Sequence, residues 1–319
     1  MHNRITLEPK WGAAFRLAPL FAFVVFPGVV ATAQTSEQTP EKQDSSFQIS
    51  VDLNLVVLPV TVRDRKGAFA GDLTKENFAV YEDGVKQSIR LFRHEDIPVT
   101  AGIVVDHSGS MTGKIADVVA AAEKFADLSN PRDQMFVVNF NERASLGLPP
   151  NVRFTHFATL LREAIENAPA AGQTALYDAL GLAIERLHDG KPDKKVLVVF
   201  SDGGDNASQM KLHDVLDKAA QSNAIVYTLG IFAKDDPDQN TGVLKRLAKE
   251  SGGQAFFPEH YRDAAEICAE IAKEIRHQYM LGYVSSSTKS GGHRKLKVEA
   301  HAPGKDLTVR TRSGYEAAP

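Results

Sequence analysis

The chain has 319 residues, 43% of them hydrophobic, which is enough to bury a core in one to three domains. Its formal net charge of −3 and the lack of a long basic run argue against a nucleic-acid partner. The single cysteine, Cys268, excludes an internal disulfide. Because it lies in an apolar helical pattern, we expect a buried core residue rather than a nucleophile.

Residues 1–33 have the charge and hydropathy order of a signal peptide. A basic start precedes the apolar run Leu17–Val30, and Ala31-Thr32-Ala33 forms a cleavage signal. The run is shorter than the about 20 residues that a membrane span requires. We therefore predict export to the periplasm or the medium, with no stable membrane span in the mature chain; an uncleaved N-terminal anchor is the alternative. Residues 34–46 are polar and are expected to form a disordered linker.

Residues 47–98 form a predicted N-terminal β region. The stretch FQISVDLNLVVLPVTVRD alternates apolar and polar residues over much of its length. Asp83-Gly84 separates two further strand-like runs, and this dipeptide is a strong hairpin signal.

From residue 99 to residue 278 the pattern changes to apolar strands that alternate with amphipathic helices. This order predicts an α/β domain with a mostly parallel sheet covered by helices on both faces. The predicted strands are Thr100–Asp106, 135–140, 196–201, 224–232 and 254–257. The predicted helices are Lys114–Leu128, Ala158–Asn167, Leu176–Leu187, Leu212–Ser222, Val243–Glu250 and Tyr261–His277.

Residues 279–316 return to a β pattern. The strand-like segments YMLGYV, HRKLKVEAHA and DLTVRTR surround a loop rich in serine and glycine. We expect this region to pack with residues 47–98 into one β-sandwich-like unit, with the α/β domain inserted between its halves. Two separate small β units are the alternative.

Oxygen-bearing side chains gather where the predicted parallel strands end. Asp106, Ser108 and Ser110 follow the strand Gly102–Val105, while Thr174 precedes a helix and Asp202 ends another strand. Ligand sites of open α/β sheets form beyond the carboxyl ends of the strands, so these five side chains can converge. Carboxylates and hydroxyls are hard ligands that suit Mg²⁺, Mn²⁺ or Ca²⁺ rather than zinc.

The order Asp106-x-Ser108-x-Ser110, then Thr174 in GQTAL, then Asp202 in SDG resembles the metal-ion-dependent adhesion site of von Willebrand factor type A (VWA) domains. The resemblance spans roughly Val99–Gln278 and implies a Rossmann-like fold whose metal is completed by an acidic residue of a protein partner. It also implies that Ser108, Ser110 and Thr174 bind the ion directly. The two aspartates would bind it directly or through water. The flanking β segments resemble exported bacterial proteins that carry such a domain and are abundant in acidobacteria.

Other patterns are weaker. The loop DPDQNTG imitates a calcium loop, but its glycine is one place late for an EF-hand and Leu247 stands at the twelfth position. Asp205 and Asn206 are expected to support the metal loop or its turn, and His107 is expected to be an exposed loop histidine. No recognisable nucleophile or second metal accompanies the five residues.

Three functional hypotheses follow for these residues. The leading one is a non-enzymatic, metal-dependent binding module. The second is a metal-assisted hydrolase with Asp205 or His107 as base. The third is a metal that only holds loops together.

Overall fold

The structure is a computed structural model that describes residues 55–232 and 239–317. The expected signal peptide and linker lie outside these residues, as do Asp236 and Asp238 of the calcium-like loop. No helix within the described ranges is long and apolar enough to cross a membrane.

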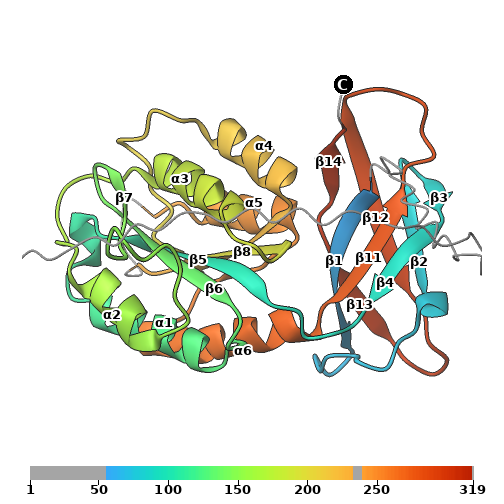
Figure 1. Ribbon diagram of the computed structural model, residues 1–319, viewed down its shortest axis with the longest axis horizontal. Coiled ribbons are helices and arrows are strands. Elements are labelled where there is room, and N and C mark those ends of the chain that lie inside the picture. The colour runs from blue at the N-terminus through green and yellow to red at the C-terminus, as the bar shows by residue number, and fades with distance from the viewer. Residues whose placement is uncertain (1–54, 233–238, 318–319) are drawn as a thin grey trace, which may run out of the picture. The chain divides into compact units, whose positions relative to one another are not determined.

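A six-stranded sheet forms the centre of the α/β part, in the order β10-β9-β8-β5-β6-β7 (Figure 1). All neighbouring strands are parallel except β7, which pairs antiparallel with β6. The strands are β5 (Val99–Asp106), β6 (Gln134–Phe140), β7 (Ala144–Leu146), β8 (Lys194–Ser201), β9 (Ala224–Gly230) and β10 (Ala255–Phe256). Every residue of β5 and of β9 is buried, as expected for strands covered on both faces. The predicted α/β class is confirmed. Strand β7 was not among the predicted strands.

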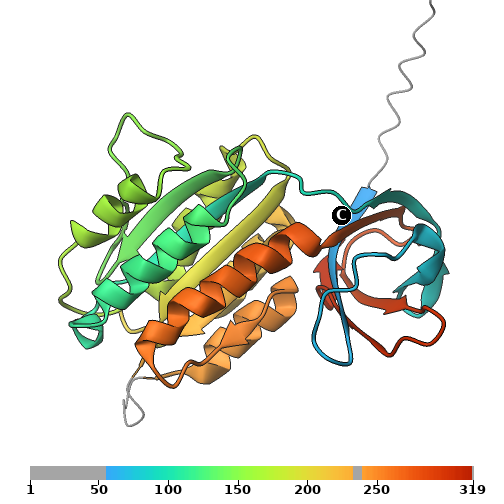
Figure 2. The same ribbon diagram turned by 90° about the horizontal axis from the view of Figure 1, so that it is seen from below.

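Helices cover both faces of this sheet (Figures 1 and 2). Helices α1, α2 and α6 lie on one face, α3 and α4 lie on the other, and α5 packs against β9. The helices are α1 (Ile115–Asp127), α2 (Ala158–Glu166), α3 (Leu176–His188), α4 (Leu212–Ser222), α5 (Thr241–Ser251) and α6 (Ala264–His277). The helix predicted from Tyr261 begins with a 3-10 turn, Tyr261–Asp263, before α6. Cys268 is fully buried on α6, as predicted.

Strands from the two ends of the described chain share two antiparallel sheets, in the orders β13-β1-β11-β4 and β14-β12-β2-β3. They are β1 (Leu55–Asp64), β2 (Phe78–Glu82), β3 (Val85–Gln87), β4 (Ile89–Arg93), β11 (Tyr279–Val284), β12 (His293–Ala300), β13 (Leu307–Arg310) and β14 (Gly314–Glu316). Strand β1 lies between β13 and β11, and β2 lies beside β12. The alternative of two separate β units is therefore wrong.

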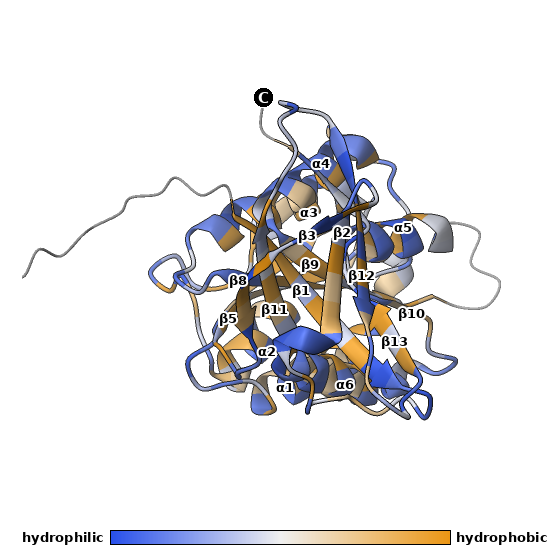
Figure 3. Cartoon of the chain, turned by 90° about the vertical axis from the view of Figure 1, so that its right-hand side faces the viewer, coloured by the Kyte–Doolittle hydropathy of each residue, from blue (hydrophilic) through white to orange (hydrophobic). Residues whose placement is uncertain are grey.

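The two antiparallel sheets enclose a core of their own. Leu58 and Leu281 from one sheet pack in a cluster with Val80 and Val298 from the other. Figure 3 shows the hydrophobic colour concentrated on strands, whereas the outer loops are largely hydrophilic. The sandwich thus depends on apolar faces contributed by both ends of the chain.

The predicted hairpin at Asp83-Gly84 is confirmed. Glu82 pairs with Val85, and the two residues between them both have positive φ, 49° and 83°. A two-residue turn with both φ values positive is the type I′ turn, whose twist matches that of the strands, and Asp-Gly is among its preferred sequences.

One buried carboxylate joins the sandwich to the central sheet. Glu274 of α6 is 1% exposed and accepts hydrogen bonds from Thr61 Oγ1 at 3.2 Å and Tyr227 Oη at 2.6 Å. Two arginines, Arg63 of β1 and Arg310 of β13, form ion pairs with it. Burial alone would raise the pKa of Glu274, but the Arg310 charge and the hydrogen bonds from Tyr227 and the two arginines hold it below its usual value.

Replacing Glu274 with glutamine should destabilise the protein strongly. The change leaves Arg63 and Arg310 without their buried counter-charge, and breaking such a pair costs about 3–5 kcal/mol. Since the folded-state pKa is lowered, the carboxylate stabilises the fold above its unfolded pKa and loses that effect as the pH falls through its folded pKa. Urea unfolding at neutral and acidic pH measures both effects.

Glu270→Gln is the matched control, because Glu270 pairs with the same Arg63 but its side chain is 47% exposed. Exposed pairs contribute about 0–1 kcal/mol. Equal losses in the two variants would show that Glu274 is not the centre of this junction.

Candidate metal centre

The candidate metal centre lies where β5 and β8 end beside each other. Val105 of β5 pairs with Phe200 of β8, so Asp106 and Asp202 follow on neighbouring strands. Strand β6 lies on the other side of β5, and the chain connections therefore diverge between β5 and β8. Such a topological switch point opens a crevice at the carboxyl ends of the strands, where ligands of this fold class bind.

Four of the five predicted ligands form one hydrogen-bonded group. Ser110 Oγ donates to Asp202 Oδ2 at 2.8 Å, and Ser108 Oγ lies 3.1 Å from Ser110 Oγ. Asp106 accepts from the Ser108 backbone N–H and from Ser201 Oγ, both at 2.8 Å. The structure therefore brings Asp106, Ser108, Ser110 and Asp202 together.

Both carboxylates of this group are withdrawn from water. Asp106 is fully buried and Asp202 is 1% exposed. Burial raises the pKa of Asp106 to about 6; hydrogen bonds from Ser108 and Ser201 oppose the shift, and the Asp202 charge adds to it. The folded chain thus holds a buried negative charge that a bound cation would stabilise.

The donor set suits a hard divalent ion. Within residues 55–232 and 239–317, no group of three or more His, Cys, Asp or Glu side chains is placed to hold a metal. An ion at this site would therefore depend on the serine and threonine hydroxyls as well as on Asp106 and Asp202. Oxygen ligands of this kind fit Mg²⁺, Mn²⁺ or Ca²⁺.

Thr174 is placed beside the group by its backbone. Its loop contacts the Ser108–Ser110 loop, because Gly109 N donates to Gly172 O at 3.2 Å. Gly172 has φ +87°, which is why a glycine is needed at this turn. Thr174 itself is 7% exposed, and its side chain forms no hydrogen bond with another of the five residues in the described structure.

Asn206 holds Thr174 through a reciprocal pair of hydrogen bonds. Thr174 N donates to Asn206 Oδ1 at 2.8 Å, and Asn206 N donates to Thr174 O at 2.9 Å. The expectation that Asn206 supports the site agrees with this geometry. The sequence gives no signal for the partner, since the two residues are 32 positions apart.

Asp205 serves the start of α3. Its Oδ1 accepts from Tyr177 N at 3.1 Å and from Ser208 Oγ at 2.6 Å, and Ser208 Oγ also accepts from Tyr177 N at 3.0 Å. These groups satisfy backbone N–H groups that the first turn of a helix leaves unpaired. The carboxylate is therefore engaged in capping, which does not favour its role as a catalytic base.

The prediction that His107 is an exposed loop histidine is wrong. His107 is 1% exposed, and its Nε2 lies 3.1 Å from Asn139 Oδ1. Asn139 Nδ2 donates to Ala164 O, so Asn139 Oδ1 is the acceptor and His107 Nε2 carries the proton. His107 N also donates to Phe140 O, which continues the contact with β6 beyond the end of β5. Burial lowers the pKa of His107. Its bond to Asn139 connects the loop after β5 to the neighbouring strand β6.

Asn240 of the calcium-like loop has a structural role. Its Oδ1 accepts from Val243 N at 3.2 Å and caps α5. Capping by asparagine is a common way to satisfy the first turn of a helix, so Asn240 is explained without a second ion.

Residues 102–270 match the model of the von Willebrand factor type A domain, which is more than half of the chain, and the chain belongs to this family. The resemblance seen in the sequence is confirmed at the level of the family. An uncharacterized protein of Synechocystis sp. is 30% identical over 185 residues, which cover 56% of this chain and 42% of that protein. The chain thus matches less than half the length of this relative.

The solved structure of one protein of this family agrees with the fold. A von Willebrand factor type A protein from Catenulispora acidiphila is 14% identical, with a TM-score of 0.50 over 84% of this chain and 74% of its own. The von Willebrand factor domain of a type V pilus tip protein from Porphyromonas gingivalis is 13% identical, with a TM-score of 0.47 over 56% of this chain and 95% of its own. At these identities the likeness concerns the fold alone.

Asn206→Ala should weaken divalent-ion binding without unfolding the protein. The side chain is exposed, so its loss leaves the core intact, but Thr174 loses the acceptor that fixes its backbone N–H. Loss of one such hydrogen bond corresponds to about a 2- to 10-fold change in ion affinity. Calorimetry with Mg²⁺ and Mn²⁺ measures it.

Two variants control this experiment. Asn206→Asp keeps the acceptor oxygen and should retain binding, whereas Gln209→Ala removes an exposed side chain of the same loop and should change nothing. If Asn206→Ala binds the ions as tightly as the wild type, Asn206 does not position Thr174 for them.

Proposed function

We propose that this protein is an exported, non-enzymatic binding module that uses a divalent cation to grip an acidic group of a protein partner. The VWA domain is generally a protein-interaction module. The proposed ligands are Asp106, Ser108, Ser110, Thr174 and Asp202, with Mg²⁺ as the ion or Mn²⁺ or Ca²⁺ in its place. Export rests on the proposed signal peptide, residues 1–33, and residues 99–278 are the proposed ion-binding domain.

The observation that carries the proposal is the buried acidic pair linked through Ser108 and Ser110. Asp202 accepts from Ser110, and Asp106 lies close enough for the Asp202 charge to raise its pKa. Neither carboxylate forms an ion pair with a lysine or arginine within the described residues. The nearest cation on this loop, Lys114, instead donates to Ile231 O at 3.2 Å.

The same ligand set supports capture of an acidic partner. Mg²⁺ requires six oxygen ligands, and five protein residues leave room for water or for an incoming carboxylate. The two carboxylates would balance the two charges of the ion, so a partner carboxylate would bind by filling the open coordination position. Asp106 and Asp202 would hold the ion, while Ser108, Ser110 and Thr174 add neutral oxygens and orient it.

The hydrolase hypothesis receives less support from the geometry. Its two candidate bases are engaged elsewhere, Asp205 at the start of α3 and His107 with Asn139. The third hypothesis, an ion that only holds loops together, differs from the proposal in lacking a partner. Metal-dependent capture of a partner separates the two.

Asp106→Ala and Asp202→Ala should abolish binding of Mg²⁺ and Mn²⁺, because each removes a charged ligand. Ser108→Ala, Ser110→Ala and Thr174→Ala should weaken it, because each removes a neutral one. Calorimetry on each variant measures ion binding, and pulldown from an envelope extract with Mg²⁺ or with chelator measures capture. Unchanged ion binding in both aspartate variants would mean that these residues do not build the site.

Asp106→Asn should stabilise the metal-free protein at neutral pH. The pKa of Asp106 is raised to about 6, so the wild-type fold loses stability as the pH rises from the unfolded pKa, 3.8, through 6. The raised pKa corresponds to a penalty of about 3 kcal/mol above pH 6, which the amide avoids. Thermal unfolding in chelator at pH 4 and pH 7.5 tests this prediction. A variant that is less stable than the wild type at both pH values contradicts it.

A further inference from the structure

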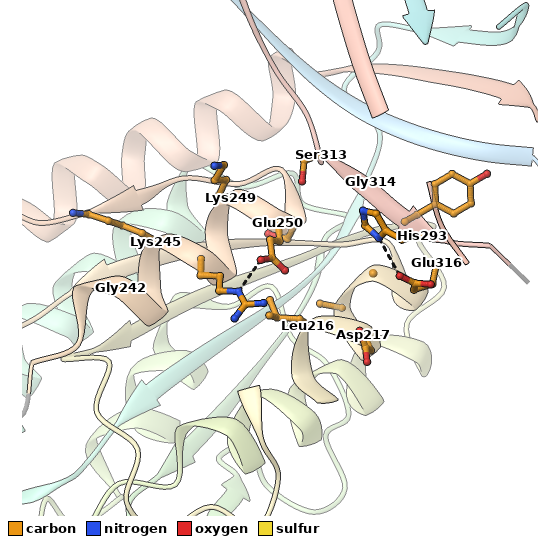
Figure 4. A pocket seen from close by; sticks show the side chains of 15 residues that line it. Leu216, Asp217, Gly242, Lys245, Lys249, Glu250, His293, Ser313, Gly314 and Glu316 are labelled. Carbon is orange, nitrogen blue, oxygen red and sulfur yellow. Dashed lines mark hydrogen bonds and ion pairs between the residues drawn. The ribbon is translucent and has the colours of Figure 1, made fainter. Parts of the chain in front are cut away.

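Two adjoining clefts lie beside the edge strand β14, away from the candidate ion ligands. The first, of about 670 Å³, lies among α4, α5 and β14 (Figure 4). The second, of about 400 Å³, reaches the start of β1. Both are lined by Ala220, Tyr315 and Glu316, so together they form one groove along β14, which we call the β14 groove.

One wall of the β14 groove is a free strand edge. Among the strands of residues 55–232 and 239–317, β14 pairs only with β12. Leu296 N donates to Ser313 O, and Ala317 N donates to Gly292 O. In an antiparallel ladder the bonded residues alternate, so Ser313, Tyr315 and Ala317 face β12. The backbone N–H and C=O groups of Gly314 and Glu316 therefore point away from β12, and both residues line the groove.

The opposite wall comes from α4 and α5. Leu216 and Ala219 of α4 give it apolar surface, and Lys245 and Lys249 of α5 are exposed above it (Figure 4). Neither lysine forms an ion pair in the described part of the chain. The wall thus presents two cations that no carboxylate of the described residues neutralises, above two apolar side chains that are largely buried.

The groove is positively charged although the chain is negative overall. Its lining contains six cationic side chains and three carboxylates, and Asp83 outside the lining pairs with Arg294, which leaves a formal excess of two positive charges against −3 for the whole chain. The cations are Lys245, Arg246, Lys249, Lys289, Arg294 and Arg312. Arg312 is 6% exposed, and its Nε has no hydrogen-bond partner among the described residues.

We propose that the β14 groove binds an extended, acidic segment of a partner protein, which adds to β14 as a further strand. Free donors and acceptors that alternate along a strand edge are matched by another polypeptide backbone. The excess positive charge selects acidic side chains. A nucleic acid would meet the charges but not the alternating backbone groups. This surface shares no residue with the proposed ion site.

The probe is a fluorescein-labelled peptide of alternating glutamate and valine, followed by fluorescence anisotropy with the full chain in chelator. Because strand addition derives its affinity from main-chain hydrogen bonds, a generic sequence of this kind suffices. We expect binding of this peptide. We expect none of the same peptide N-methylated at alternate residues, or of a lysine and valine peptide of equal length.

Two protein variants locate the peptide. Glu316→Pro removes the outward N–H and leaves the ladder to β12 intact, so it should abolish binding, whereas Glu316→Ala keeps that N–H and should bind. The double change Lys245→Glu and Lys249→Glu should weaken binding by about tenfold.

The proposal is overturned if the wild-type chain does not bind the glutamate and valine peptide, or if Glu316→Pro binds it as well as Glu316→Ala does. Equal binding of the lysine and valine peptide would overturn the acidic preference. Since the measurement is made in chelator, its result is independent of whether the proposed ion site exists.

Discussion

The central constraint in this molecule is the burial of two carboxylates at the ends of adjacent parallel strands. Parallel strands bring their carboxyl ends to one edge of the sheet, and the topological switch between β5 and β8 opens that edge to a ligand. Asp106 and Asp202 occupy it without a lysine or arginine partner among the described residues. A low dielectric makes such a pair costly, so the arrangement has a physical reason to persist if a cation binds there.

The loops around this pair are also held by contacts that do not involve the side chains of the candidate ligands. The loop after β5 is tied to the Thr174 loop through Gly109 and Gly172, and the Thr174 loop is tied to the loop after β8 through Asn206. Asp178 adds a further link, because it accepts from Gln209 N and Met210 N. The positions of the proposed ligands are therefore set in the ion-free fold, and this would reduce the entropy cost of binding an ion there.

The sequence was sufficient for the features that depend on local pattern. Hydrophobic periodicity located β5, β8 and their helices to within a few residues, and Asp83-Gly84 predicted its turn because a two-residue hairpin requires positive φ. The spacing of Asp106, Ser108 and Ser110 after a strand is also a local pattern, and it predicted that their side chains gather in one loop. The pairing of the two terminal β regions was also predicted, although it joins distant segments. The burial and the partners of several polar side chains were missed or misjudged.

Three residues show why the sequence did not predict these polar contacts: His107, Asn206 and Glu274. His107 is polar and lies in a loop, and only the fold reveals that Asn139 on the neighbouring strand satisfies it inside the protein. The bond from Asn206 to Thr174 joins two loops that are remote in sequence. Glu274 lies on an amphipathic helix among other charged residues, and nothing local distinguishes it from the exposed Glu270. Burial of a polar side chain is a property of tertiary structure, which periodicity in one segment does not report.

The junction at α6 indicates specificity rather than stability as the reason for so much buried charge. Glu274 is joined there by Lys194, which donates to Ile275 O and whose pKa burial lowers to about 7. Arg276, on the same helix, holds the segment between β4 and β5 through Asp96. Apolar side chains of similar size would stabilise such an interface at least as well, because the cost of removing the charged groups from water offsets most of their Coulomb attraction. An apolar interface, however, tolerates sliding, whereas the bonds of this network form only when β1, β9, β13 and α6 meet in one arrangement. The junction therefore fixes how the helix that leaves the α/β part enters the sandwich.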